Sequence, residues 1–371
     1  MPPSNSFAIT VLPGDGIGVE VMAPALEVLA AAEKRVGGYA LRLTEKPAGA
    51  GLYRDTGESL PKATLDSVRK TDATLLAAMG LPSVRNPAGV EITPQIELRM
   101  EFDLYAGVRP VKTWPGMPRV LADPRAESLD FVVIRESTEG LFATRGAGAI
   151  VNDMVATETL VLTRGTSERL FDFGFKLARA RKARGKPGRF TCVDKANVFR
   201  SFAWFRKIYD ERAANFPDIE KSYAYVDAMA LDFVRRPWTL DVMAMENMFG
   251  DILSDLGAGL MGGMGMAPSA DIGDEHAVFQ PCHGTAPDIV GQGKANPTAM
   301  ILSAALMLEW LGDKHNLTSA HQAARLIEAA VSKAYVDHDL KPFELGGPDG
   351  TVAITKAVLA AMATIDPKGL A

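Results

Sequence analysis

The sequence predicts an α/β protein with a largely parallel central sheet and a second domain inserted into the first. Short apolar runs that end at glycine or charged residues alternate with longer amphipathic segments, a pattern typical of strands alternating with helices. The length, 371 residues, suits about two domains. Two hinge-like points, the extended segment 108–111 and the glycine-rich stretch from Gly257, separate a discontinuous domain (1–108 and 261–371) from an inserted one (109–260).

The elements follow in order along the chain. A buried strand is predicted over 7–12, then the turn 14–18, then a helix whose apolar positions between Val21 and Ala32 form one broad face. Further strands are predicted at 74–78, 131–134 and 190–193, and residues 311–371 resemble paired amphipathic helices completing the first domain. Ligands of such sheets bind at the carboxyl ends of the strands, where Asp15, Arg135, Lys195 and Asp227 are expected.

Composition excludes several classes of function. A net charge of -5 argues against nucleic-acid binding, and the basic segment 176–189 reads as a solvated helix end. Two cysteines, Cys192 and Cys282, cannot make a disulfide framework, so we expect a cytoplasmic setting. No Lys or Arg precedes Lys34, and no uninterrupted apolar run reaches membrane-spanning length, so neither a secretory signal nor membrane association is expected.

The segment 246–255 carries the strongest local signal. If it is helical, Asp251 and Asp255 lie on one face, where two carboxylates repel each other. Two solvated surface acids are the alternative, but Met248, Phe249, Ile252 and Leu253 predict a mostly buried segment in which unpaired carboxylates are costly. A hard cation, Mg²⁺ or Mn²⁺, resolves that conflict.

Two further side chains belong to the same hypothesis. Asp227, after an apolar run, is either a third carboxylate for the ion or a helix N-cap. Lys195 follows a predicted strand and precedes a helix, and a lysine near a dication can act as a base. An exposed lysine at a helix start is the commoner alternative.

Three arginines, Arg99, Arg109 and Arg135, offer planar guanidinium groups that match carboxylates in pairs of hydrogen bonds. Taken singly, each is more often a surface ion pair; together they favour an anionic substrate modestly. Of two glycine-rich segments, 14–18 lacks the last glycine of a dinucleotide fingerprint, with Val19 in its place. The other, 283–297, is a loop of the kind that wraps a nucleotide.

Taken in order, these motifs resemble the isocitrate/isopropylmalate dehydrogenase family, the metal-dependent β-decarboxylating dehydrogenases, and most closely its tartrate and D-malate branch. The motifs are Leu12 to Gly18, Arg99, Val108-Arg109-Pro110, Arg135 to Gly140, Asp194 to Asn197, Tyr225 to Asp227, Glu246 to Asp251 and His283 to Pro287. The likeness is dense from residue 7 to about 310.

The resemblance implies a role for each matching residue and the isopropylmalate dehydrogenase-like two-domain fold. Arg99, Arg109 and Arg135 would bind the malate-like part of the substrate. Asp251 and Asp255 would hold the metal together with Asp227 of a partner subunit, whose Lys195 would transfer the proton, so a homodimer with shared active sites is implied. The cofactor loop would comprise His283, Gly284, Thr285, Ala286, Asp288, Ile289 and Asn296. Asp288 favours NAD, because a carboxylate binds a ribose hydroxyl but repels a 2′-phosphate.

The chain departs from the family at two places. Phe142 stands where a tyrosine commonly supplies a proton after decarboxylation. Thr93 and Gln95, six and four residues before Arg99, lie where the variable part of the substrate is read, and their polarity speaks against isopropylmalate.

We therefore expect an NAD-dependent, Mg²⁺- or Mn²⁺-dependent oxidation of a small 2-hydroxy acid such as D-malate or tartrate, with decarboxylation where the substrate allows it. The alternatives are a non-catalytic regulatory member of the family, motivated by Phe142 alone, a dehydrogenase of 3-isopropylmalate or isocitrate, and oxidation of a phosphorylated alcohol, for which Arg145 is the one nearby extra cation.

Overall fold

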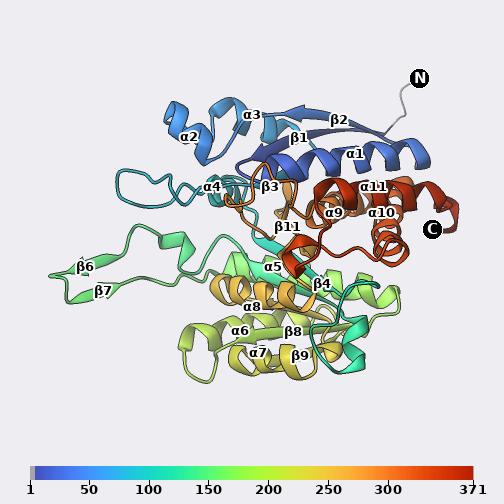
Figure 1. Cartoon of the computed structure of the whole chain (residues 1–371). Coiled ribbons are helices and arrows are strands. Elements are labelled where there is room, and N and C mark those ends of the chain that lie inside the picture. The colour runs from blue at the N-terminus through green and yellow to red at the C-terminus, as the bar shows by residue number, and fades with distance from the viewer. Residues whose placement is uncertain (1–4, 371) are drawn as a thin grey trace.

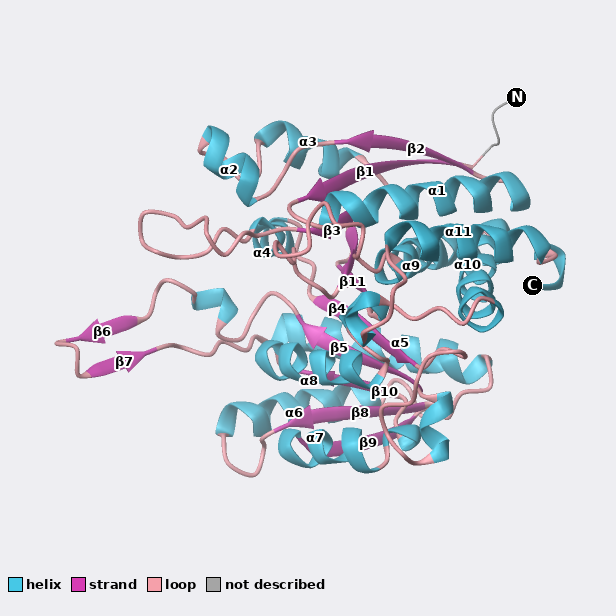
Figure 2. Ribbon diagram, in the orientation of Figure 1, coloured by secondary structure: helices cyan, strands magenta, loops and turns pink. Residues whose placement is uncertain are grey.

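The computed structural model describes residues 5–370, and one ten-stranded sheet runs through it (Figures 1 and 2). The strand order is β2-β1-β3-β12-β11-β4-β5-β10-β8-β9. The strands are β1 (Ser6–Gly14), β2 (Ala40–Glu45), β3 (Ala73–Ala78), β4 (Ala106–Lys112), β5 (Asp130–Glu136), β8 (Arg189–Asp194), β9 (Glu220–Tyr225), β10 (Val242–Met245), β11 (Pro268–Ile272) and β12 (Ala277–Pro281).

The sheet is parallel on both flanks and antiparallel in the middle. Strands β2, β1, β3 and β12 are mutually parallel, and so are β5, β10, β8 and β9. Between them β12, β11, β4 and β5 pair antiparallel. The predicted α/β class with a largely parallel sheet is confirmed. The antiparallel centre was not predicted; β11 and β12 adopt it because only a short turn joins them.

Helices cover the sheet in two groups. Around the first half lie α1 (Gly18–Val36), α2 (Ala50–Thr56), α3 (Lys62–Lys70), α9 (Thr298–His315), α10 (Thr318–Asp337) and α11 (Thr351–Thr364), and α9 packs on β3, β11 and β12. The others are α4 (Pro94–Glu101), α5 (Arg164–Ala183), α6 (Arg200–Ala213), α7 (Val226–Arg235) and α8 (Asn247–Leu260). Of these, α5 and α6 pack together against β8, while α8 packs against β4 and β5. Figure 1 shows the blue and red ends of the chain side by side in one half and the green to yellow segments in the other.

Most predicted elements are present, but the prediction of a glycine-rich turn from Gly257 is wrong. The runs at 7–12, 74–78, 131–134 and 190–193 lie within β1, β3, β5 and β8. Helix α8, however, continues to Leu260. Gly257 permits close packing instead of a turn, because a Cβ on it would lie 2.6 Å from Cγ2 of Val111.

The second predicted hinge, 108–111, is extended as expected but lies inside β4, in the middle of the sheet. Pro110 is tolerated there because β11 pairs with β4 only as far as Val108. The strand order collects residues 6–78 with 268–281 in one half and 106–245 in the other. The domain boundaries at 108 and 261 remain a prediction.

A thin hairpin, β6 (Ala149–Val151) and β7 (Val155–Thr157), projects from the body (Figure 2). An isolated two-stranded hairpin is marginally stable in water. This one exposes apolar side chains, with Ile150 77% and Met154 83% exposed. The basic segment 176–189 ends α5, and several of its cations pair with acids, Arg179 with Asp218 and Arg181 with Asp241 among them. None of the described helices is long and apolar enough to cross a membrane.

Candidate active site

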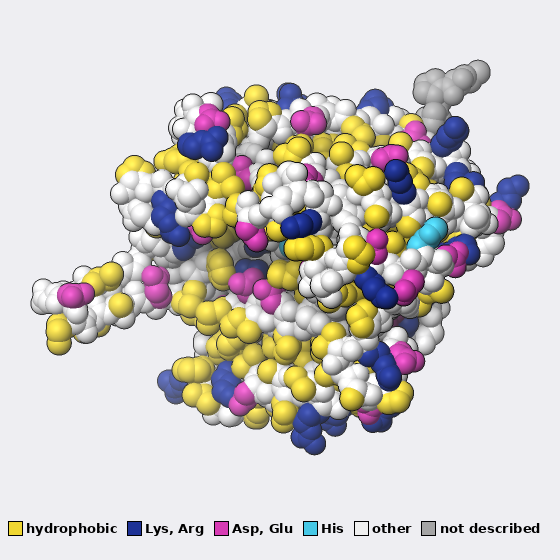
Figure 3. All heavy atoms as spheres, viewed as in Figure 1, with side chains coloured by type: hydrophobic (Ala, Val, Ile, Leu, Met, Phe, Trp, Pro, Cys, Tyr) yellow, Lys and Arg dark blue, Asp and Glu magenta, His cyan; other side chains and the backbone are white. Residues whose placement is uncertain are grey.

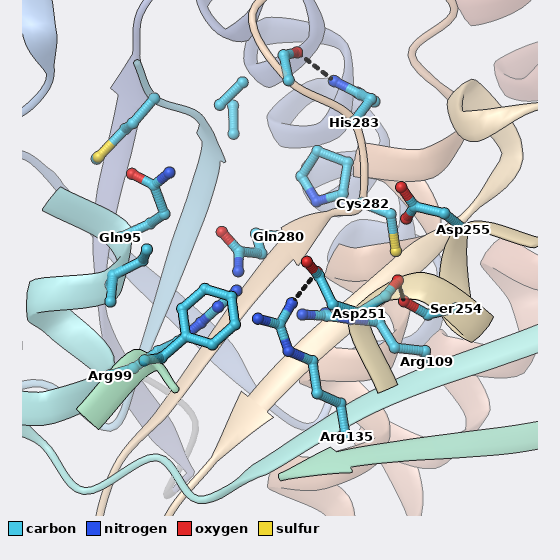
Figure 4. Close-up of a pocket in the computed structure, with 17 residues that line it drawn as sticks. Gln95, Arg99, Arg109, Arg135, Asp251, Ser254, Asp255, Gln280, Cys282 and His283 are labelled. Atoms are coloured by element: carbon cyan, nitrogen blue, oxygen red, sulfur yellow. Dashed lines mark hydrogen bonds and ion pairs between the residues drawn. The ribbon is translucent and has the colours of Figure 1, made fainter. Parts of the chain in front are cut away.

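A cavity of about 250 Å³ lies in a hollow between the two halves, where acidic and basic side chains gather (Figures 3 and 4). It brings together residues from α4, β4, β5, α8 and the segment after β12. Eight predicted site residues line it: Gln95, Arg99, Arg109, Arg135, Asp251, Asp255, His283 and Gly284.

The three arginines converge although they come from three elements. Arg99 lies in α4, Arg109 in β4 and Arg135 in β5, and all three are buried. Arg135 donates from Nε to Oδ1 of Asn247 at 2.8 Å and pairs with Asp251 (Figure 4). Burial and the neighbouring Arg99 lower the pKa of Arg135 to about 10. Three buried guanidinium groups that line one cavity are suited to binding the carboxylates of a ligand.

The two acids of the proposed metal site lie one turn apart on α8, so the predicted helical spacing is confirmed. Burial and the charge of Asp251 raise the pKa of Asp255. Two adjacent carboxylates, one already paired with Arg135, suit a divalent cation bound by oxygen. The segment is less buried than predicted: Ile252 is 61% exposed and Asp255 is exposed, because their side of α8 faces solvent in a single chain.

Lys195 and Asp227 lie elsewhere, and neither lines the cavity in the described chain. Lys195 follows β8, and its Nζ pairs with Oδ2 of Asp227 at 2.8 Å. The pair with Lys195 lowers the pKa of Asp227. Asp227 is not the N-cap of α7, a position that Tyr225 holds; it lies in the first helical turn, because β9 runs directly into the helix.

The two glycine-rich segments meet. The backbone N–H of Ile17 donates to the carbonyl of Thr285, and Gly16 adopts a positive φ of 57° against that residue. A Cβ on Gly16 would lie 2.2 Å from the Thr285 oxygen, so the close approach requires glycine. No local pattern predicts this pairing, since 268 positions separate Ile17 from Thr285.

The loop after β12 has features that fit a nucleotide. Nε2 of His283 is buried and has no hydrogen-bond partner among the described residues, and burial lowers the pKa of the ring, so the ring is neutral. Ala286 has a positive φ of 37°, and Asp288 is exposed while Ile289 is half-buried. Asn296 is already engaged: its amide donates to Glu344 at 2.9 Å and its carbonyl accepts from Thr298.

Gln95 and Thr93, the two residues expected to contact the variable part of the substrate, lie in different environments. Gln95 lines the cavity next to apolar Ile96, and its Oε1 is buried and accepts no hydrogen bond from the part of the chain that the structure describes. The hydroxyl of Thr93 accepts a hydrogen bond from Arg145 at 2.9 Å and does not line the cavity. Phe142 does line it, with its ring centroid 5.0 Å from the Arg135 guanidinium carbon.

Two residues that lie beside the arginines, Asp271 and Gln280, were not predicted from the sequence. Asp271 in β11 pairs with Arg99 and Arg109, and Gln280 in β12 donates to Asp271. The available signal was an acid inside the apolar run Pro268–Ile272, because a carboxylate in a buried strand needs cationic partners.

Comparison with known proteins identifies the family. The family model described as isocitrate/isopropylmalate dehydrogenase matches residues 8–359. The chain belongs to this family. This chain is therefore an enzyme of the decarboxylating hydroxy-acid dehydrogenase family. Members of the family use NAD and a divalent magnesium or manganese ion.

Individual relatives agree with that assignment. The 3-isopropylmalate/3-methylmalate dehydrogenase of Methanocaldococcus jannaschii is 40% identical over 94% of this chain and 97% of its own. The 3-isopropylmalate dehydrogenase of Thermobifida fusca is 42% identical over 83% and 87%. The crystal structure of isocitrate dehydrogenase from Methylococcus capsulatus superposes with a TM-score of 0.83, at 35% identity, covering 96% of this chain and 99% of that one.

Behind the cavity, Glu136 gives a prediction about stability. Burial raises its pKa to about 7, against hydrogen bonds from Thr138 and Glu139 that favour the ionised form. The folded chain therefore holds a proton that the unfolded chain, with a pKa near 4.5, releases. The free energy of unfolding should fall between pH 4.5 and pH 7, by up to about 3 kcal/mol from this group.

Urea unfolding of a Glu136→Gln variant across this pH range tests the prediction. The variant should lose that part of the slope, while Glu58→Gln, at an exposed position, should keep it. Equal slopes for the Glu136→Gln variant and the native chain would contradict it.

Proposed function

We propose that this chain oxidises and decarboxylates a 2-hydroxy acid of the malate type, with or without a substituent at C3, with NAD and Mg²⁺ or Mn²⁺. The convergence of Arg99, Arg109 and Arg135 on one cavity with Asp251 and Asp255 carries the proposal. The relatives named as 3-isopropylmalate dehydrogenases make 3-isopropylmalate the first candidate. Gln95, a half-buried polar residue at the cavity wall whose Oε1 is buried, favours a second candidate, the D-malate or tartrate predicted from the sequence.

The residues divide the work as follows. The guanidinium groups grip the carboxylates of the substrate and orient its C2 hydrogen toward the cofactor loop. Asp251, Asp255 and a partner's Asp227 would hold the metal, which when bound lowers the hydroxyl pKa and stabilises negative charge on the substrate oxygens. A partner's Lys195 would accept the hydroxyl proton, and NAD, when bound at the cofactor loop, would supply the acceptor for the C2 hydride. Phe142 carries no transferable proton, so water or another group must protonate the carbon left by CO₂.

We further propose that the active unit is a homodimer. Lys195 and Asp227 lie outside the cavity of their own chain, which is thereby incomplete. Leu231 and Val234 on α7 and Ile252 on α8 expose apolar side chains. Hydrophobic side chains gather over this half of the molecule in Figure 3. Such a surface on adjacent helices is typical of a subunit interface.

The direct test is NADH formation with Mn²⁺ on 3-isopropylmalate, 3-methylmalate, D-malate, the tartrates and isocitrate. Turnover of one acid that stops with EDTA is expected, and CO₂ release would show whether decarboxylation follows. Absence of turnover on every acid, with Mn²⁺ binding demonstrated, would favour the regulatory alternative.

A further inference from the structure

A buried carboxylate lies beneath the arginines of the cavity. Asp271 is in β11, at the middle of the sheet between β12 and β4, and is 1% exposed. Room for it depends on the neighbouring strand. Its register partner Gly107 has no Cβ; one there would lie 3.2 Å from Oδ1 of Asp271 and 2.5 Å from Oγ of Ser137.

Four side chains donate to this carboxylate. Nε of Arg99 lies 3.1 Å from Oδ2 and Nη2 of Arg109 lies 3.3 Å from Oδ1. Nε2 of Gln280 lies 2.5 Å from Oδ2, and Oγ of Ser137 lies 3.4 Å from Oδ1. Burial would raise the pKa of Asp271, but the charges of Arg99 and Arg109 outweigh it and lower that pKa. The carboxylate is therefore ionised.

These contacts decide which donors remain for a ligand. Asp271 occupies Nε of Arg99 and Nη2 of Arg109, whereas Nη1 of Arg109 is buried and has no hydrogen-bond partner among residues 5–370. Arg99, Arg109 and Gln280 line the cavity, but Asp271 does not (Figure 4). The carboxylate thus fixes the inner side of two guanidinium groups and leaves their outer donors to face the cavity. It also offsets the repulsion among three buried cations.

We propose that Asp271, held by Gln280, is a positioning residue that orients Arg99 and Arg109 for the carboxylates of the substrate. The inference rests on the proposed function for the identity of the ligand. The role requires one negative charge in the pair formed by the side chains at positions 271 and 280, which are hydrogen-bonded to each other. Gln280 donates a hydrogen bond directly to Asp271. Placing the carboxylate at position 280 and the amide at position 271 therefore shifts the negative charge to the neighbouring side chain and keeps it near the arginines.

The test compares Asp271→Asn with the double variant Asp271→Asn/Gln280→Glu. Calorimetry measures D-malate binding to the protein without NAD or metal, and KM and kcat are measured on whichever acid turns over. Asp271→Asn should weaken D-malate binding about 10- to 100-fold, as expected for loss of hydrogen bonds to charged groups. The double variant should recover at least tenfold of the loss, and KM for the acid should follow the same order.

The matched control is Asp241→Asn. Asp241 is also buried and holds Arg181 and the backbone of Gly188, away from the cavity. This variant should lower thermal stability and leave D-malate affinity unchanged. Native affinity in Asp271→Asn, or a double variant no better than the single one, would overturn the proposal. If Asp271→Asn does not fold, a folded double variant that fails to bind D-malate overturns it.

The two proposals fail in different ways. D-malate binding that follows this order without turnover of any acid would refute the proposed reaction and support the role of Asp271. If the native chain turns over another acid without binding D-malate, the reaction stands and KM for that acid decides the role of Asp271: a native KM in Asp271→Asn overturns it.

Discussion

Lys195→Ala is expected to lose activity by roughly 100- to 10,000-fold, the range for loss of a general base. D-malate binding should change far less, because Arg99, Arg109 and Arg135 are untouched. The measurement is kcat and KM on the acid that turns over, with calorimetry for binding. Lys207→Ala, which removes an exposed lysine of α6 paired with Glu211, is the matched control and should retain native kcat.

A mixed dimer sharpens this prediction into a test of shared sites. When the Lys195→Ala chain is combined with an inactive Asp251→Asn chain, half of the dimers are mixed, and each mixed dimer holds one intact site. Activity should therefore return to roughly a quarter of the native value. If Lys195 served the cavity of its own chain, mixing would restore nothing, and the proposed homodimer mechanism would be wrong.

Neutralising the acids of α8 is expected to give the second large effect. Asp255→Asn should weaken Mn²⁺ binding by 100-fold or more and lower kcat/KM by roughly 1,000-fold, because a removed charged ligand leaves the cation under-coordinated. Mn²⁺ titration followed by electron paramagnetic resonance measures the affinity directly. Asp66→Asn on α3, at a half-buried aspartate that is paired with Arg69 outside the cavity, is the control.

Asp251→Asn should differ from Asp255→Asn in one respect. Asp251 also pairs with Arg135, so its neutralisation should raise KM for the acid in addition to weakening Mn²⁺ binding. Asp255 has no such pair with Arg135, and saturating Mn²⁺ should restore more of the activity of Asp255→Asn. Identical behaviour of the two variants, or native Mn²⁺ affinity in both, would contradict the metal assignment.

The two expectations that failed, for Ile252 and for Gly257, were both drawn from a local pattern that does not say what packs against it. Ile252 was expected to be buried because it lies in an apolar segment, yet it is exposed in a single chain. Apolar periodicity reports that a face needs cover, not whether the cover comes from the same chain or another. Gly257 was taken for a turn because glycine permits one, but it also permits close packing, and here Val111 lies against it.

Local pattern determined the class of fold, the strand that carries Arg135, the strand that Lys195 follows, and the helical spacing of Asp251 and Asp255, because period and strand ends are local properties. The order of motifs also pointed to the family. Only the tertiary structure decided that Arg99 and Arg109 share the buried Asp271, that Ile17 bonds to Thr285, and that Lys195 and Asp227 lie outside their own cavity. Each of these contacts joins elements distant along the chain, and their distance depends on strand order and packing, which no local pattern encodes.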